Sequence, residues 1–232
     1  MNEERSTRIR REYKYFLDEA QTALVRLKAD CLLLHDPHVR ADGTYFVSSL
    51  YFDDIHDSCL NDCVLNNEIR SKYRIRCYNS DPSSLFLEKK SKEYGYSHKE
   101  VCPITEEEFR GILRGELPEI RGSDSSIRKR LLSDLFVLGL RPKLIVSYDR
   151  AAYTYDAGNL RLTVDGGLCS SSEVDAFLSG DYMRRPVYSV GQSLLELKWS
   201  ELIPRHIYDA FSLDSLTRTA FSKYLICSKL HL

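Results

Sequence analysis

The segment RSKYRIRCY, residues 70–78, carries a basic side chain at every second position. Successive side chains of a β-strand point to opposite faces, so as a strand this segment presents cations on one face and a largely apolar surface on the other. The cations are Arg70, Lys72, Arg74 and Arg76. Such a face is often the solvated side of an antiparallel sheet. Solvated faces usually mix signs, however, because like charges opposite each other across strands are destabilising.

The same bias recurs in the other segments that alternate like strands. Their charged phases hold more cations than carboxylates, although the whole chain is balanced, with 33 Lys and Arg against 34 Asp and Glu and a net charge of −1. These charged phases comprise Glu12, Lys14, Lys72, Arg74, Arg76, Glu88, Lys90, Arg161, Asp165, Glu196 and Lys198. The excess of cations is therefore a property of these strand faces rather than of the chain.

A polar face crowded with lysine and arginine requires a counter-ion of high negative charge density. Arginine forks match phosphate oxygens in a bidentate manner, and lysine acts as a point charge. The few carboxylates suit a divalent cation that bridges phosphates, since Mg²⁺ and Mn²⁺ prefer oxygen ligands. We therefore expect the cationic faces to bind a phosphate chain.

The elements that must position these side chains are segments with the two-residue period of a β-strand and segments with the spacing of an α-helix. Strand-like alternation occurs over residues 8–16, 44–54, 70–78, 84–94, 97–102, 143–153, 159–167 and 193–200. Helical spacing or capping predicts helices over residues 18–31, 105–115 and 125–140, with a loop or short helix before residue 70 and two helical pieces after Pro204.

The spacing of residues within these segments, and residue types that are typical of turns, give three local predictions. The first helix is predicted from apolar residues at helical spacing, which are Ala23, Leu24, Leu27 and Cys31. Arg150 shares its phase with apolar residues, so it is expected at a strand end. The sequences Asp53-Asp54 and Asp165-Gly166-Gly167 are typical of turns that end strands, and we leave these aspartates out of the site.

A sheet with helices over its apolar side must place its charged side somewhere. An open solvated face is one solution. A closed antiparallel barrel with a polar lumen fits better, because closure also removes the edge strands. We therefore predict an α+β fold in which an antiparallel β-barrel forms a polar, cation-lined tunnel with peripheral helices, in a single domain over residues 1–232.

Composition argues against several other classes. The balanced charge gives no reason to expect nucleic-acid binding. No segment approaches the roughly 18 apolar residues of a membrane span, and the charged N-terminus is not a secretory signal. The seven cysteines contain no CxxC pair, which is typical of reduced thiols in a cytosolic protein, so we expect a cytoplasmic location.

Several short motifs, taken in chain order, resemble the VTC-type polyphosphate polymerase domain of the CYTH or triphosphate-tunnel superfamily. The motifs are RREYKYF, SSLYFDD, KYRIRCY, FLEKKSK with SHKEV, SYDRAAY, NLRLTVD, LLELK and FSKY. Each is weak by itself, but the ordered set covers nearly the whole chain and is quite specific. The resemblance implies a tunnel-forming antiparallel barrel. It also implies transfer of a nucleoside triphosphate γ-phosphate onto a polyphosphate chain, with a divalent metal, Mn²⁺ or Mg²⁺, as cofactor.

The resemblance also implies roles for individual residues. The catalytic set is Arg74, Arg76, Lys90 and Glu196. Substrate binding adds Lys14, Lys99, Tyr148, Arg150, Arg161, Lys198, Ser222 and Lys223. Glu196 in LELK matches the metal-binding glutamate, and Glu12 fits an N-terminal ExK pattern that supplies a second carboxylate.

Three functions follow from these residues. The first is a metal-dependent polyphosphate polymerase that uses ATP or another nucleoside triphosphate, with polyphosphate or pyrophosphate as its other partners. The second is a tripolyphosphatase or nucleoside triphosphatase, in which water replaces the chain-end nucleophile and Glu12, Glu88 and Glu196 supply carboxylates. The third is a non-catalytic polyphosphate-binding module, which keeps the cations but does not need Glu196.

Overall fold

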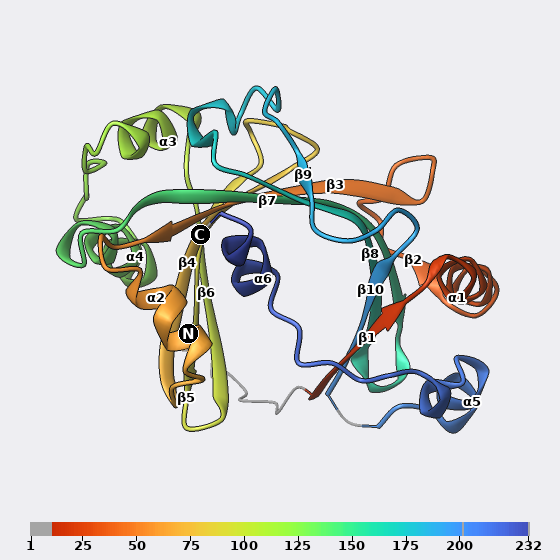
Figure 1. Cartoon of the computed structure of the whole chain (residues 1–232). Coiled ribbons are helices and arrows are strands. Elements are labelled where there is room, and N and C mark those ends of the chain that lie inside the picture. Colours follow the sequence, from red (N-terminus) through yellow and green to blue (C-terminus); the bar gives the residue numbers. More distant parts are fainter. Residues whose placement is uncertain (1–10, 201, 232) are drawn as a thin grey trace. The chain divides into compact units, whose positions relative to one another are not determined.

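The structure, a computed structural model that describes residues 11–200 and 202–231, is an α+β fold with a large antiparallel sheet (Figure 1). Its strands are β1 (Arg11–Leu17), β2 (Leu34–His35), β3 (Thr44–Asp53), β4 (Ile69–Tyr78), β5 (Leu85–Glu93), β6 (Tyr96–Pro103), β7 (Arg141–Tyr155), β8 (Leu160–Ser171), β9 (Arg185–Pro186) and β10 (Ser193–Trp199). Its α-helices are α1 (Glu19–Leu32), α2 (Ser58–Val64), α3 (Glu106–Leu113), α4 (Ser126–Val137), α5 (Arg205–Ala210) and α6 (Lys223–Lys229). All the predicted elements are present; residues 8–10 of the first predicted strand lie outside the described range.

The sheet order is β1-β10-β8-β7-β3-β4-β5-β6, with β2 paired to β7 and β9 paired to β8. The two ends of this order are β1 and β6, and within the described residues no pairing joins them. The predicted antiparallel α+β class is therefore confirmed, whereas the strand pairing does not show a closed barrel.

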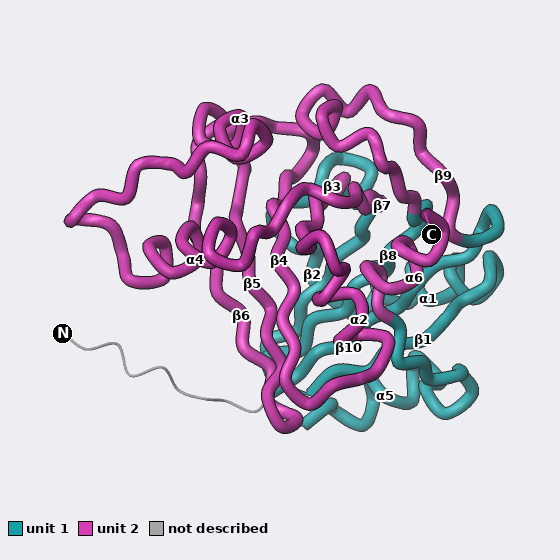
Figure 2. Tube along the Cα trace, turned by 60° about the vertical axis from the view of Figure 1, so that its left-hand side comes forward, with its two compact units in different colours: residues 1–45, 149–168, 188–221 teal, residues 46–148, 169–187, 222–232 magenta. Residues whose placement is uncertain are grey.

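The chain divides into two compact units, each built from three segments (Figure 2). Unit 1 comprises residues 1–45, 149–168 and 188–221, and unit 2 comprises residues 46–148, 169–187 and 222–232. The division of each unit into separated segments follows from the long strands β7 and β8, which pass from one unit to the other.

In unit 2, the alternation of residues 70–78 separates an apolar from a charged face. Tyr73, Ile75 and Cys77 of β4 are buried in a core that includes leucines of β5 and α4. Figure 1 shows α4 on one side of strands β4–β6 and α6 on the other. One face of these strands therefore packs on a hydrophobic core, and the opposite face carries the cations.

In unit 1, the hydrophobic core lies between strands β1, β8 and β10 and the helices α1 and α5. The predicted helix is present as α1, but the apolar residues that predicted it are not the ones it buries. Val25 and Ala29 are buried, whereas Leu24 and Leu27 are 50% and 62% exposed. The helix carries two apolar stripes, and periodicity does not show which stripe meets the core.

The predictions that Arg150 lies at a strand end and that Asp165 lies in a turn are also wrong. Strand β7 continues to Tyr155, so Arg150 lies inside it, and β8 continues to Ser171, beyond Asp165. The reason is an ion pair between these two side chains: Arg150 Nε and Nη2 donate to the Asp165 carboxylate at 2.6 and 2.8 Å. A buried charge interrupts a strand only if nothing compensates it, and here each residue compensates the other.

Candidate phosphate-binding site

The cationic face of unit 2 is a grid built by strand register. Tyr51 of β3, Arg74 of β4 and Glu88 of β5 form one cross-strand row. In the adjacent row Lys72, Lys90 and Lys99 lie opposite one another. Like charges opposite one another across strands are destabilising, and one of the three lysines, Lys99, lies against Glu88 of the neighbouring row.

Glu88 is the carboxylate at the centre of this grid. It is only 3% exposed, and three cations converge on it. Its oxygens lie 2.6 Å from Arg74 Nη2, 2.8 Å from Lys99 Nζ and 3.8 Å from Arg76 Nη2. Burial by itself raises the pKa of Glu88, but the charge of Arg74, followed by those of Arg76 and Lys99, outweighs burial and lowers this pKa to about 2. The carboxylate is therefore ionised and holds the cations in place.

Two tyrosines extend the arginine contacts. Tyr51 accepts a hydrogen bond from Arg74 Nη1 at 2.9 Å, and Tyr78 accepts one from Arg76 Nη1 at 3.2 Å. Arg74 is thus held by both an anion and a hydroxyl. Of the two guanidinium groups, that of Arg76 therefore makes the longer contacts with the protein.

Helix α6 brings further polar groups to the same unit. Lys72 Nζ donates to Ser222 Oγ at 3.0 Å, and Ser222 also caps α6 by accepting from Leu225 N at 3.3 Å. Lys223 Nζ lies 4.9 Å from the centre of the Tyr148 ring. The predicted residues Tyr148, Ser222 and Lys223 are therefore brought together by the start of one helix.

In unit 1, a second group of predicted residues forms a cluster on β1 and β10. Lys14 lies opposite Glu196, and Glu12 lies opposite Lys198. Lys14 Nζ is 3.2 Å from Glu12 and 3.9 Å from Glu196, while Lys198 Nζ is 2.9 Å from Glu196. The two carboxylates and two ammonium groups thus alternate in sign across the strand pair.

The remaining predicted residues of unit 1 each contact an aspartate. Arg150 is bidentate with Asp165, which is fully buried. Arg161 Nη2 lies 2.9 Å from Asp36 and donates to Tyr45 Oη at 3.1 Å. Sequence reasoning missed both aspartates as partners, because each is distant in the chain from its arginine or was interpreted as part of a turn.

The chemistry of the unit 1 cluster fits a divalent metal that also uses substrate oxygens. Within the described residues no group of three or more His, Cys, Asp or Glu side chains is suited to hold a metal. Mg²⁺, however, is commonly bound by one or two carboxylates together with phosphates and water, and Glu12 and Glu196 provide two. Thr163, opposite Glu196 on β8, adds a buried hydroxyl with no hydrogen-bond partner among the described residues. These residues therefore fit such an ion.

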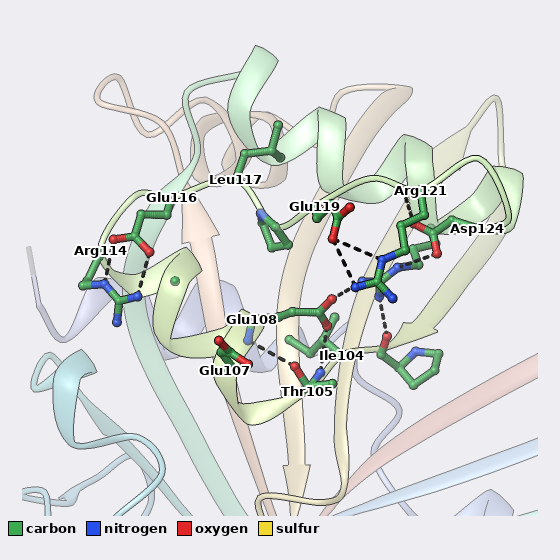
Figure 3. Close-up of a pocket in the computed structure, with 14 residues that line it drawn as sticks. Ile104, Thr105, Glu107, Glu108, Arg114, Glu116, Leu117, Glu119, Arg121 and Asp124 are labelled. Carbon is green, nitrogen blue, oxygen red and sulfur yellow. Dashed lines mark hydrogen bonds and ion pairs between the residues drawn. The ribbon is translucent and has the colours of Figure 1, made fainter.

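A cavity of about 600 Å³ lies elsewhere in unit 2, between α3 and the start of α4 (Figure 3). Each of its three arginines pairs with a carboxylate: Arg114 with Glu116, Arg121 with Glu119, and Arg128 with Glu108. None of the predicted site residues lines it. Because its lining holds five carboxylates and three arginines, this cavity is a weaker candidate for an anion site than the cationic face.

Comparison with known proteins identifies the family of the chain. Residues 9–231 match the VTC domain family. The chain belongs to this family. Membership of the VTC family supports a polyphosphate-related enzyme of the triphosphate-tunnel type, as the sequence resemblance implied. A comparison with curated proteins finds no match.

Solved structures share the fold of this VTC domain at low sequence identity. A candidate adenylate cyclase from Bacillus halodurans is 15% identical with a TM-score of 0.53, over 91% of this chain and 92% of that chain. The PH1819 protein from Pyrococcus horikoshii OT3 is 12% identical with a TM-score of 0.49, over 96% and 99%. The first likeness supports the fold alone. None of the helices in the described part of the chain is long and apolar enough to cross a membrane.

Proposed function

We propose that this VTC domain is a metal-dependent phosphotransferase, a polyphosphate polymerase that transfers the γ-phosphate of ATP onto a polyphosphate chain. The observation that carries the proposal is the row of Lys72, Lys90 and Lys99 beside Arg74 and Arg76. Arg74, Arg76 and Lys99 lie around a single carboxylate, Glu88, so three cations share one anion and the face favours a polyanion. The cation-lined tunnel expected from the sequence is part of this proposal.

In this proposal the protein positions groups and neutralises charge, and no covalent nucleophile is needed. Arg74, Arg76 and Lys90 hold the β- and γ-phosphates, with Lys99, Tyr148, Ser222 and Lys223 as further contacts. A terminal oxygen of the polyphosphate chain attacks the γ-phosphorus, and the bond to the bridging oxygen of ADP breaks. Arginine and lysine stabilise the charge that spreads over the transferred group.

The charged cluster of unit 1 supplies the proposed metal site. Glu196 and Glu12 would hold Mn²⁺ or Mg²⁺, and a bound ion supplies neutralisation of phosphoryl oxygens. Lys14 and Lys198, which flank both carboxylates, are proposed as phosphate ligands. Arg150 and Arg161 are proposed as substrate contacts as well, although each also binds an aspartate.

The test is incubation of the protein with ATP and Mn²⁺, followed by gel analysis of polyphosphate and assay of free phosphate. We expect long polyphosphate and stoichiometric ADP. Release of free phosphate without polymer would contradict the polymerase and favour a triphosphatase. Absence of any turnover, together with binding of polyphosphate, would favour a binding module.

The variant Arg76→Lys keeps the charge but loses the guanidinium fork, and it should lower the rate of ATP turnover in this assay by about tenfold or more.

A further inference from the structure

Two adjacent serines of β3 point to opposite faces and differ in their hydrogen bonding. Ser48 and Ser49 are both buried, at 2% and 1% exposure. The hydroxyl of Ser48, on the core face, lies 3.2 Å from the hydroxyl of Tyr182. The hydroxyl of Ser49, on the cationic face, has no hydrogen-bond partner among the described residues.

A second buried donor without a partner lies directly across from Ser49. Register places Arg76 of β4 opposite Ser49. Arg76 is 8% exposed, and while its Nη1 donates to Tyr78, its Nε is without an acceptor in the described part of the chain. Buried polar groups are almost always hydrogen-bonded, so two such donors on paired strands point to an acceptor that the described residues do not supply.

The chemistry of the two donors defines this acceptor. The Arg76 Nε–H only donates, and the Ser49 hydroxyl can direct its proton to the same point. Glu88 does not serve them, because its closest contact with Arg76 is 3.8 Å, from Nη2, while Arg74 and Lys99 lie within 2.8 Å of its oxygens. An anionic oxygen with several lone pairs satisfies both donors, and a phosphoryl oxygen is the species that this cationic face attracts.

We infer that Ser49 Oγ and Arg76 Nε form a subsite that binds one phosphoryl oxygen of a triphosphate or polyphosphate. Ser49 is then a substrate-binding residue beyond those predicted from the sequence. The inference rests on the proposed function, because it takes a phosphate chain as the ligand. The subsite adds specificity: a donor pair fixed by two neighbouring strands selects an oxygen at a defined position, whereas lysines alone attract any polyanion.

The test is calorimetric titration of the protein with inorganic tripolyphosphate at constant ionic strength. Ser49→Ala should weaken binding by about tenfold to 100-fold, the range for a hydrogen bond to a charged group. Ser48→Ala is the matched control, since it removes a neighbouring buried hydroxyl from the core face, and its affinity should stay within about twofold of wild type. Ser49→Cys, which keeps the shape but is a weak donor, tests the same point if Ser49→Ala does not fold.

Coupling between the two donors provides an independent readout. If Ser49 and Arg76 bind the same oxygen, the loss of affinity in the double variant Ser49→Ala/Arg76→Lys will be smaller than the product of the two single losses. Wild-type affinity in folded Ser49→Ala or Ser49→Cys, or independent losses in the double variant, would overturn the subsite while leaving the proposed function intact. If the wild-type protein does not bind tripolyphosphate, both the subsite and the proposed function fail.

Discussion

At the scale of single residues, Glu88 determines how the cationic face is held together before a substrate binds. Three cations contact one buried carboxylate, so Arg74 and Lys99 are fixed in position by an internal anion. In the proposed function, an incoming phosphate chain therefore meets Arg74 and Lys99 already ordered. Less side-chain entropy is lost on binding than with mobile lysines.

Replacing Glu88 by Gln should change the acid stability of the protein. The pKa of Glu88 is lowered from its ordinary value of 4.5 to about 2 in the folded protein. Its ionised form therefore contributes to the free energy of unfolding above pH 4.5, and this contribution, about 3 kcal/mol, is lost as the pH falls from 4.5 to 2. Urea unfolding of wild type and Glu88→Gln between pH 7 and pH 2 should show a difference that shrinks across this window.

The exposed pair Arg121–Glu119 supplies the control for this experiment. Glu119→Gln removes a carboxylate that is 74% exposed, so its unfolding free energy should stay close to that of wild type at every pH. A difference between Glu88→Gln and wild type that is constant from pH 7 to pH 2 would contradict the charge assignment of Glu88.

Replacing Glu196 by Gln should separate binding from catalysis. The amide keeps the size of the side chain but lacks the charge that a hard divalent cation needs. Tripolyphosphate should still bind, and metal-dependent turnover should collapse by about 100-fold or more. Titration of Mn²⁺ against activity checks this prediction: the metal midpoint should move to higher concentration, whereas Glu119→Gln should leave it unchanged. A modest loss of activity with an unshifted midpoint would mean that Glu196 is only an ion-pair partner of Lys198.

At the scale of elements, α6 is anchored to β3 by a buried hydrogen bond. Tyr224 Oη donates to Asp53 Oδ2 at 2.6 Å, and the Tyr224 ring stacks on Tyr51 at 4.7 Å. The same Asp53 carboxylate accepts from the backbone N–H groups of Cys59 and Leu60, at the start of α2. Asp53 therefore joins three elements, and it fixes the helix that carries Ser222 and Lys223.

The variant Tyr224→Phe should lower both stability and phosphate affinity. It keeps the ring but leaves the buried Asp53 carboxylate with one donor fewer, at a cost of about 1–3 kcal/mol. Thermal unfolding and tripolyphosphate titration measure the two effects. Tyr182→Phe, which removes the hydroxyl beside Ser48 on the core face, should lower stability without changing affinity. Equal affinities for the two variants would contradict a positioning role for α6.

The elements themselves were largely predictable from the sequence, but their contacts were not. The alternation of residues 70–78 predicts β4 well, because each phase of the segment has a uniform character. The Thr105 capping box likewise predicts the start of α3. The convergence of Arg74 and Lys99 on Glu88 depends on the register of three strands, which alternation does not fix. The two apolar stripes of α1 show the same limit, since only packing decides which of them is buried.

At the scale of the whole molecule, charge is balanced globally and segregated locally. A net charge of −1 provides no long-range attraction for polyanions. Binding must therefore come from the cationic faces at short range, where partly buried groups are screened less by salt than exposed ones. This distribution distinguishes the protein from a generally basic protein that binds any polyanion.

The distribution of charge leads to a prediction for the melting of the entire chain. If the proposed function holds, tripolyphosphate binds the folded face and not the dispersed lysines and arginines of the unfolded chain, so at 100 times its Kd it should add about 2.7 kcal/mol to the free energy of unfolding. For a chain of this size the melting temperature should rise by roughly 5–10 °C. Sodium sulfate at equal ionic strength controls for screening and general anion effects, and it should give a smaller rise because it cannot span a row of cations. Arg76→Lys with tripolyphosphate should also show a reduced shift, because lysine lacks the guanidinium fork. A shift that is equal in sulfate and tripolyphosphate would show that the face binds anions without selecting a phosphate chain.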